Sequence, residues 1–224
     1  MEFAALNNIK ITQGLRSELL NNIQINHGFT ANETAKCSEL FIPKQKHTNI
    51  ILENPDDMTE NIADGVILTR PGKVGVQTAD CVPLLISHSK FKAAIHCGWR
   101  GSFAGIIDRF FDWLDSHNYQ GSDCQFVIGP AIFPPHYQVK EDFVTALYEW
   151  MPQQQSQHFL KIDSSTSWQF NLPAAIIYDL MTRKSVPAKN IEWIKENTYT
   201  SPQLHSYRRD SKQAGRNINW IEHV

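Results

Sequence analysis

Between residues 64 and 114 the hydrophobic pattern changes from short apolar runs to a helical period, and this change limits the folds that the chain can adopt. Short apolar runs bounded by turn residues are typical of strands, and they lie at residues 64–70, 74–77, 82–86 and 92–99. From Phe103 to Leu114 the apolar side chains recur every three or four residues, which predicts a helix with Ser102 as its N-cap. Strands that alternate with helices predict a mixed α/β fold.

The remaining segments continue this alternation. Strands are predicted at residues 125–128, 191–194 and 217–221, and helices at residues 141–150 and 173–183. Asn171 or Leu172 is expected near the cap of the second helix, and residues 151–167 are expected to form an exposed loop. With 224 residues, 42% of them hydrophobic, the chain can bury a sizeable core, so we expect a single domain over residues 1–224.

Charge and cysteine usage argue against several classes of function. A net charge of −2 and a pI near 6.5 give no basic surface for nucleic acid, so no nucleic-acid partner is expected. The chain has neither a signal-peptide pattern nor the roughly 18 consecutive apolar residues of a membrane span, which predicts a cytoplasmic protein without a membrane partner. The irregular spacing of Cys37, Cys81, Cys97 and Cys124 predicts reduced thiols rather than disulfides.

A possible metal site is indicated by His47, Cys81 and His96, which lie in or beside the apolar runs. Three protein ligands are typical of a catalytic zinc site, because the fourth position stays open for water or substrate. Polar residues accompany each of the three: Gln45 precedes His47 by two positions, Asp80 precedes Cys81, and Arg100 follows His96 by four. This combination favours catalytic chemistry.

Strand alternation separates ligand from core in the run 91–98. Successive side chains of a strand face opposite ways, so Cys97 shares a face with Ile95 and is expected in the core, whereas His96 faces the site. If residues 41–51 are extended, Gln45 and His47 also project to one side.

Structural interpretations of the same residues remain open at this point. A histidine in a strand is commonly a hydrogen-bonded structural residue, and a free cysteine before an apolar run is commonly buried. Asp80 can equally be a turn or cap residue, and Arg100 can be part of a surface ion pair. The spacings of 34 and 15 residues between His47, Cys81 and His96 do not decide, because only the fold can bring such distant ligands together.

Five successive segments resemble the signatures of the YfiH/YlmD family. This family is also known as the laccase-domain or polyphenol oxidase family, and as a peptidoglycan editing factor or purine nucleoside phosphorylase family. The matching segments are residues 45–47, 63–86, 93–107, 128–139 and 206–216. Two of them contain the specific motifs T-A-D-C-V-P and H-x-G-W-R-G.

The resemblance implies a zinc ion held by His47, Cys81 and His96, with copper as the less expected metal. It implies a YfiH-like fold of packed mixed β-sheets flanked by helices. It also implies phosphorolysis of adenosine, inosine, guanosine or methylthioadenosine, and deamination of adenosine, so a nucleoside and phosphate are the expected partners. A monomer or weak homodimer is expected.

These reactions give the accompanying residues expected roles. In deamination zinc activates water, and Asp80 is the candidate proton shuttle, with Gln45 beside the metal or substrate. In phosphorolysis Arg100, next to the start of the predicted helix, is the candidate anion site. Of Arg208 and Arg209, one is expected near the substrate and the other in a structural ion pair.

The chain departs from the family pattern in places, and other functions remain open. The region ahead of residue 45 is short, with 15 residues at 30–44, and Ala131, His136 and Asn197 stand where relatives often carry cysteines. Fewer soft ligands disfavour a copper-dependent polyphenol oxidase. A hydrolase with Cys81 as nucleophile and His96 as base is chemically reasonable. Hydrolytic editing of a peptidoglycan precursor and a zinc-stabilised binding module are further alternatives.

Overall fold

The computed structural model describes residues 8–31, 40–56 and 61–224. Cys37 and much of the short region ahead of Gln45 lie outside the described residues. The strands are β1 (Lys10–Thr12), β2 (His27–Thr30), β3 (Leu40–Phe41), β4 (Ile51–Glu53), β5 (Gly65–Leu68), β6 (Gly72–Thr78), β7 (Val82–Ser87), β8 (Lys92–Cys97), β9 (Gln125–Ile128), β10 (Gln138–Val139), β11 (Leu160–Ser164), β12 (Ser167–Phe170), β13 (Ile191–Ile194) and β14 (Asn217–His223). The α-helices are α1 (Glu18–Asn22), α2 (Trp99–Phe103), α3 (Ile106–Ser116), α4 (Glu141–Trp150), α5 (Gln153–Ser156), α6 (Leu172–Thr182) and α7 (Tyr207–Asp210).

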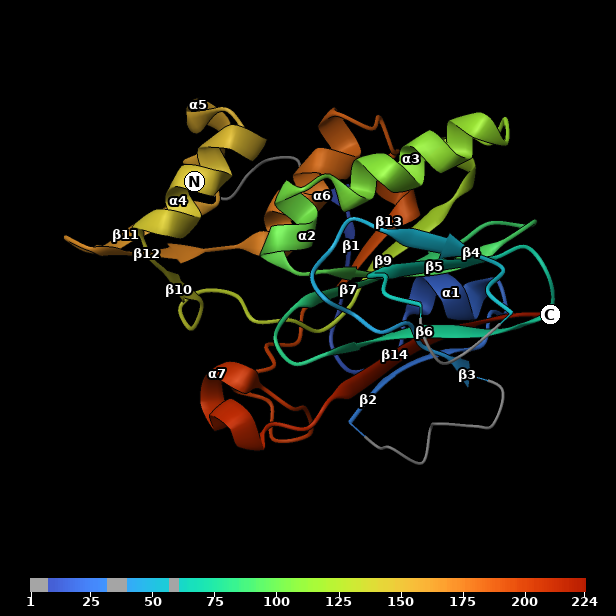
Figure 1. Ribbon diagram of the computed structural model, residues 1–224, viewed down its shortest axis with the longest axis horizontal. Helices are drawn as coiled ribbons and strands as arrows, with labels where there is room; N and C mark the ends of the chain where they lie inside the picture. Colours follow the sequence, from blue (N-terminus) through green and yellow to red (C-terminus); the bar gives the residue numbers. More distant parts are fainter. Residues whose placement is uncertain (1–7, 32–39, 57–60) are drawn as a thin grey trace.

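A seven-stranded mixed sheet, in the order β1-β13-β9-β7-β8-β5-β4, forms the middle layer (Figure 1). On one face, alternate residues of β7 such as Val82 and Leu84 belong to a core cluster that includes residues of α3 and α6. On the other face, Leu85 and Ala94 pack with Val76 of the second, four-stranded sheet. The expected mixed α/β fold of packed sheets flanked by helices is confirmed.

The chain crosses between the two large sheets twice within a short stretch. β5 belongs to the seven-stranded sheet, β6 to the four-stranded sheet β2-β14-β6-β3, and β7 again to the seven-stranded sheet. The turn at Pro71–Gly72 therefore changes layers rather than closing a hairpin. The return from β6 to β7 passes through Asp80 and Cys81, which places both residues where the two sheets end together.

The helix expected over residues 103–114 is broken in two. Gly105, with φ 86°, is the N-cap of α3, and Gly98 is the N-cap of α2, so the prediction of Ser102 as the N-cap is wrong. Glycine adopts this left-handed conformation without a steric penalty, and the break therefore falls there. The apolar period continues across it because both segments face the same core. None of the helices in the described part of the chain has the length and apolar character of a membrane span.

The structure confirms the predicted strands at residues 125–128, 191–194 and 217–221 and the predicted helices at residues 141–150 and 173–183. Asn171 is the N-cap of α6, and its side chain accepts a hydrogen bond from the Ala174 N–H. The prediction of an exposed loop at residues 151–167 is wrong, because α5 and β11 lie there. β11 pairs only with β12, in the sheet β10-β12-β11. Its side chains are largely exposed, so the strand has no alternating apolar pattern that would reveal it.

His27 lies fully buried at the start of β2 and must be neutral. Its Nε2 accepts the Ser17 N–H at 3.0 Å, so its Nδ1 carries the proton and donates to the Ile25 carbonyl at 2.8 Å. Beside it, the buried Glu192 of β13 accepts backbone N–H groups of Glu18 and Leu19 at 3.0 and 2.9 Å. Burial lowers the pKa of His27, against an opposing effect of the Ile25 carbonyl.

We expect the free energy of unfolding to fall as the pH drops below about 6.5, the usual pKa of histidine. Since the pKa of His27 is lower in the folded state, the unfolded state binds more protons and stability rises with pH. Protonated Nε2 would face the Ser17 N–H, and losing that hydrogen bond costs about 1–3 kcal/mol. Urea titrations between pH 5 and 7.5 measure this slope. It should flatten in His27→Gln but persist in His223→Gln, and an unchanged slope in His27→Gln would refute the assignment.

Candidate metal centre and its pocket

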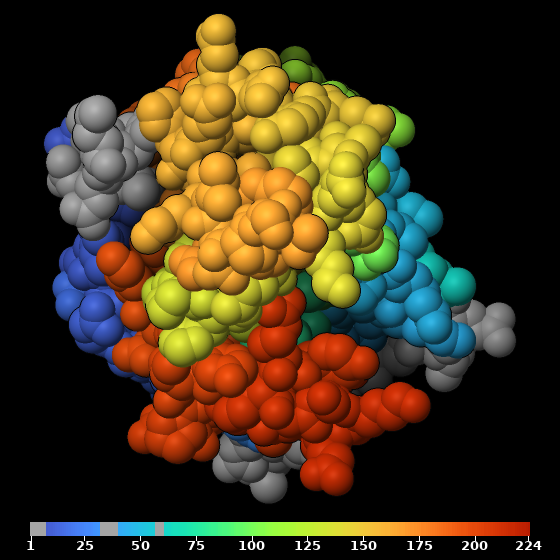
Figure 2. All heavy atoms as spheres, turned by 90° about the vertical axis from the view of Figure 1, so that its left-hand side faces the viewer, coloured from blue at the N-terminus to red at the C-terminus, as the bar shows by residue number. Residues whose placement is uncertain are grey.

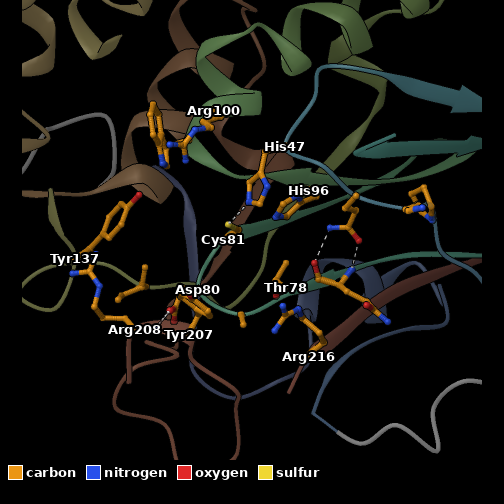
Figure 3. Close-up of a pocket in the computed structure, with 17 residues that line it drawn as sticks. His47, Thr78, Asp80, Cys81, His96, Arg100, Tyr137, Tyr207, Arg208 and Arg216 are labelled. Carbon is orange, nitrogen blue, oxygen red and sulfur yellow. Dashed lines mark hydrogen bonds between the residues drawn. The ribbon is translucent and has the colours of Figure 1, made fainter. Parts of the chain in front are cut away.

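His47, Cys81 and His96 meet where the two large sheets end (Figure 3). One potential ligand atom from each lies within 4.8 Å of the others. The Cys81 Sγ is 3.8 Å from His47 Nε2, and the two imidazole centroids are 4.9 Å apart. In the described ranges this is the one such group of three or more His, Cys, Asp or Glu side chains. The fold therefore brings the three predicted ligands together.

Strand geometry presents two of the three ligands. Cys81 immediately precedes β7, and His96 is the second-last residue of the neighbouring β8, where it pairs with Pro83. Cys97 points to the opposite face, is fully buried and belongs to the core cluster, as alternation predicted. Burial raises the pKa of the Cys97 thiol, so this thiol stays protonated.

His47 reaches the site in a different way from the one expected. Residues 41–51 are not one extended segment, because β3 ends at Phe41 and His47 has φ 60°, in the left-handed region. This conformation is uncommon for a residue other than glycine. It needs support from its surroundings, and a buried carboxylate provides that support.

Asp64 provides the support and was not predicted from the sequence. Its side chain is fully buried just before β5. Its oxygens accept the N–H groups of Lys46, His47 and Thr48 at 3.1, 3.0 and 2.6 Å, and the Thr48 hydroxyl at 2.8 Å. It also lies 2.7 Å from Nδ1 of His96. One carboxylate thus fixes the backbone that carries His47 and the ring of His96.

The Asp64–His96 contact is the arrangement expected behind a metal-binding imidazole, because it leaves Nε2 of His96 directed toward the site. Burial alone would raise the pKa of Asp64, but the hydrogen bonds from His96 and Thr48 hold it well below its usual range. An acidic residue directly before an apolar strand was the available sequence signal.

The electrostatics of the group favour a thiolate. Burial would raise the pKa of Cys81, but the His96 ring and the hydrogen bond with His47 lower it to about 6. Burial would lower the pKa of His96, but Cys81 and Asp64 raise it to about 9. Metal ligands must be deprotonated at sulfur, and a thiolate with two imidazoles is a donor set that suits zinc or copper. The residues present therefore fit a bound metal ion.

Gly98 makes room for this group. A Cβ at this position would lie 2.7 Å from Cδ2 of His47 and 3.2 Å from Sγ of Cys81. Gly101, three residues later, would meet the Thr48 carbonyl at 2.7 Å. These close approaches give the H-x-G-W-R-G motif a physical reason, because larger residues would push the His47 segment away from the metal position.

Gln45 and Asp80 line the pocket, but their polar atoms are engaged. Gln45 clamps the backbone of Gln77, donating from Nε2 to its carbonyl and accepting its N–H at Oε1, both at 2.7 Å. Asp80 accepts the Thr198 hydroxyl and the Arg208 N–H, both at 2.6 Å. Through these contacts Gln45 ties the ligand segment to β6, and Asp80 ties α7 to the Cys81 turn.

Arg100 lies in the first turn of α2 rather than before a helix that starts at Ser102. Its guanidinium carbon lies 4.1 Å from the ring centroid of Trp99, and its side chain is exposed toward the pocket. It has no ion-pair partner among the described residues. Its positive charge is therefore available to a ligand.

The two adjacent arginines of α7 are placed differently. Arg208 lines the pocket, and its guanidinium donates to the Gln138 carbonyl at 2.9 Å. Arg209 is not part of the lining; it pairs with Asp210 at 2.8 Å and donates to the carbonyls of Thr198, Tyr199, Ser201 and Leu204. The geometry therefore leaves Arg208 as the candidate for substrate contact and gives Arg209 the role of holding the loop together.

The metal group lies in a pocket of about 660 Å³, within the usual size range of small-molecule sites. Sequence reasoning did not single out several of the residues that line it: Lys44, Thr78, Trp99, Ile132, Tyr137, Tyr207 and Arg216. Figure 2 shows the red atoms of the C-terminal segment, which contributes Tyr207, Arg208 and Arg216 to the lining, below the yellow and orange atoms of the α4 and β11–β12 region, with green atoms visible between them. Segments far apart in the chain thus enclose the site.

Residues 15–223 match the family described as multi-copper polyphenol oxidoreductase laccase. The chain belongs to this family. The sequence is 32% identical to a purine nucleoside phosphorylase of Rickettsia conorii over 181 residues, covering 79% of this chain and 72% of the relative. It is 30% identical to a purine nucleoside phosphorylase of Rickettsia prowazekii over 200 residues, covering 87% and 78%.

Solved structures of the family share the fold. The hypothetical protein YfiH of Bacillus licheniformis superimposes with a TM-score of 0.80 at 21% identity, covering 90% of this chain and 94% of that one. YlmD from Geobacillus stearothermophilus gives a TM-score of 0.74 at 23% identity, covering 83% and 73%. The expected YfiH-like fold is therefore confirmed.

Proposed function

We propose that this protein is a zinc-dependent purine nucleoside phosphorylase that acts on adenosine, inosine, guanosine or methylthioadenosine. One observation carries the proposal: a His/Cys/His group lies in a pocket that is also lined by Lys44, Arg100, Arg208 and Arg216. None of these cations pairs with a carboxylate in the described part of the chain. A metal beside unneutralised cations suits a reaction between phosphate and a polar organic substrate. The names of the Rickettsia relatives point to the same reaction.

His47, Cys81 and His96 would hold the zinc ion, with Asp64 fixing the orientation of the two histidines. Bound zinc supplies a Lewis acid that polarises an oxygen of substrate or phosphate. Zinc is the expected metal because it accepts thiolate and imidazole together in four-coordinate sites that keep one position for substrate.

The surrounding residues would bind and orient the two substrates. In phosphorolysis the glycosidic C–N bond breaks, the base leaves with the electron pair, and a phosphate oxygen bonds to the ribose carbon. Arg100 would hold the phosphate anion close to that carbon, since guanidinium groups bind phosphate oxygens in a fixed geometry. Trp99 and Tyr137 provide aromatic walls for the base or sugar. Holding both reactants in place supplies much of the rate increase.

The positions of the acidic side chains favour phosphorolysis over deamination. Deamination of adenosine needs a group that moves protons, and Asp80 is the one carboxylate that lines the described pocket. Both oxygens of Asp80 already accept short hydrogen bonds, from Thr198 and Arg208. We therefore propose phosphorolysis as the main activity, and give Asp80 a positioning role.

The alternative functions have weaker support. A polyphenol oxidase with several coppers needs several metal-ligand groups, and residues 8–31, 40–56 and 61–224 contain one. Neither a hydrolase that uses Cys81 as nucleophile nor one that edits a peptidoglycan precursor uses phosphate as a reactant, so neither reaction by itself requires the unpaired cations around the metal group.

Turnover of adenosine and inosine by the zinc-loaded protein tests the proposal. We expect free base and ribose 1-phosphate to form only when phosphate is present, and elemental analysis to find one zinc per chain. Arg100→Gln should raise the KM for phosphate about tenfold, because one charged hydrogen-bond donor is lost. Arg109→Gln, an exposed arginine of α3, should match the wild type. Phosphate-independent release of base or of ammonia would refute phosphorolysis.

A further inference from the structure

Tyr207 presents an exposed aromatic side chain to the pocket of the metal group. It belongs to the pocket lining, and the residue is 53% exposed. Of the large hydrophobic side chains that are exposed in the described ranges, it is the one that lines this pocket. An aromatic face that is left exposed in a pocket with a few polar groups is typical of a surface that binds a small molecule.

The other aromatic side chains of the lining, apart from the two ligand histidines, already pack against protein. The Trp99 ring centroid lies 5.2 Å from that of Phe143, and the Arg100 guanidinium lies 4.1 Å from the Trp99 centroid. The Tyr137 ring centroid lies 6.1 Å from that of Phe143. In the part of the chain that the structure describes, no aromatic ring or cation is stacked on Tyr207. The exposed part of this ring is therefore available to a ligand.

Hydrogen bonds on both sides of Tyr207 hold its backbone beside the metal group. The next residue, Arg208, donates its N–H to the Asp80 carboxylate at 2.6 Å, and Asp80 directly precedes the cysteine ligand. The preceding residue, Ser206, is the N-cap of α7 and accepts the Arg209 N–H at 3.2 Å. A ring on a fixed backbone loses little conformational freedom when a ligand stacks on it, so less binding free energy is spent on ordering.

Tyr207 and the candidate phosphate-binding residue lie on opposite sides of the metal group. Figure 3 shows Arg100 on one side of the group and Tyr207 on the other. A phosphate at Arg100 would therefore approach the ribose carbon from the side away from a base at Tyr207. This arrangement suits phosphorolysis, because the incoming oxygen and the departing base then lie on opposite faces of the reacting carbon.

We propose that the purine base of the nucleoside stacks on the ring of Tyr207. This inference rests on the proposed function and names the part of the pocket that binds the base. Stacking uses the π face that every base has, and it does not read the groups on the edge of the base. Tyr207 therefore gives the same contact to adenosine, which carries an amino group on C6, and to inosine and guanosine, which carry an oxygen there.

Calorimetry with the zinc-loaded full chain tests this inference, with adenosine, inosine and ribose 1-phosphate as separate probes. In Tyr207→Ala the Kd for adenosine and the Kd for inosine should both rise about tenfold, because one stacking contact is lost. Tyr207→Phe keeps the ring and should bind both nucleosides within about twofold of the wild type. Ribose 1-phosphate has no base, so its Kd should be the same in the wild type and in Tyr207→Ala. The control Tyr148→Ala removes an exposed tyrosine of α4 outside the lining and should match the wild type.

Three results would overturn the inference. The first is wild-type affinity of Tyr207→Ala for both nucleosides. The second is an equal loss in Tyr207→Phe, which would assign the effect to the hydroxyl group and not to stacking. The third is an equal loss for ribose 1-phosphate, which would mean that the substitution changes the pocket as a whole.

Turnover separates this inference from the proposed function. Nucleoside binding that depends on the Tyr207 ring, without phosphate-dependent cleavage, would support the stacking contact and refute phosphorolysis. Phosphorolysis with the same KM for adenosine in the wild type and in Tyr207→Ala would refute the stacking contact and leave the proposed function in place.

Discussion

Cys81→Ala is expected to lose both the bound metal and nucleoside turnover. Removing the thiolate leaves His47 and His96, and two imidazoles do not complete a zinc site. Metal affinity should fall by more than the roughly 10–100-fold that loss of an outer-shell partner costs. Turnover should fall below about 1% of the wild-type rate, because the metal and its ligands act together in catalysis and losing one ligand removes the contribution of all of them. Elemental analysis and product formation from inosine and phosphate measure the two effects.

Cys97→Ala is the matched control. Cys97 lies close to Cys81, since it pairs with Val82, the residue that follows Cys81, but its thiol points into the core. The Cys97→Ala variant should keep its bound metal and its turnover, and its free energy of unfolding should fall by about 1 kcal/mol. Cys81→Ala with full metal content and activity would remove the metal centre from consideration. Activity of the wild type after exhaustive chelation would instead favour Cys81 as a nucleophile.

Asp64→Asn is expected to have the second-largest effect, because this one side chain supports two of the three ligands. It accepts N–H groups of residues 46–48 and contacts Nδ1 of His96. An amide in this position places an NH₂ group against several donors, so part of the network must break. Breaking a buried charged pair costs about 3–5 kcal/mol of stability, and metal affinity should fall about 10–100-fold. Urea unfolding and competition with a chelator measure these two quantities.

Asp179→Asn separates the loss of a buried carboxylate from the loss of metal support. Asp179 is as buried as Asp64, but it lies in α6 and pairs with Arg183. The Asp179→Asn variant should bind metal with wild-type affinity, even if its free energy of unfolding falls. If Asp64→Asn bound metal as tightly as Asp179→Asn does, the proposed support of His47 and His96 by Asp64 would be wrong.

Local pattern predicted the elements whose side chains alternate or recur regularly, and it failed where a residue's conformation depends on distant partners. The separation of His96 from Cys97 followed from strand alternation alone. The break at Gly105 was hidden because the apolar period continues through it. The strand β11 was missed because its stability comes from pairing with β12 and not from burial.

The roles of the polar residues around the metal group depend on contacts between segments far apart in the chain. Asp80 is engaged by Thr198 and Arg208, which lie 118 and 128 residues later. Neither partner can be identified from the neighbourhood of Asp80 in the sequence. The same holds for the choice between Arg208 and Arg209, because adjacent residues of a short helix differ only in what surrounds them.

The sequence by itself determined the class of fold, the three candidate ligands and the face from which His96 reaches them, because backbone geometry ties side-chain direction to position along a strand. Only the tertiary structure decided that these ligands converge, that Asp64 supports two of them, and that Asp80 and Gln45 hold segments in place. The physical reason is that a hydrogen-bonding group pairs with whatever donor or acceptor the fold brings within about 3 Å, and local periodicity carries no information about that partner.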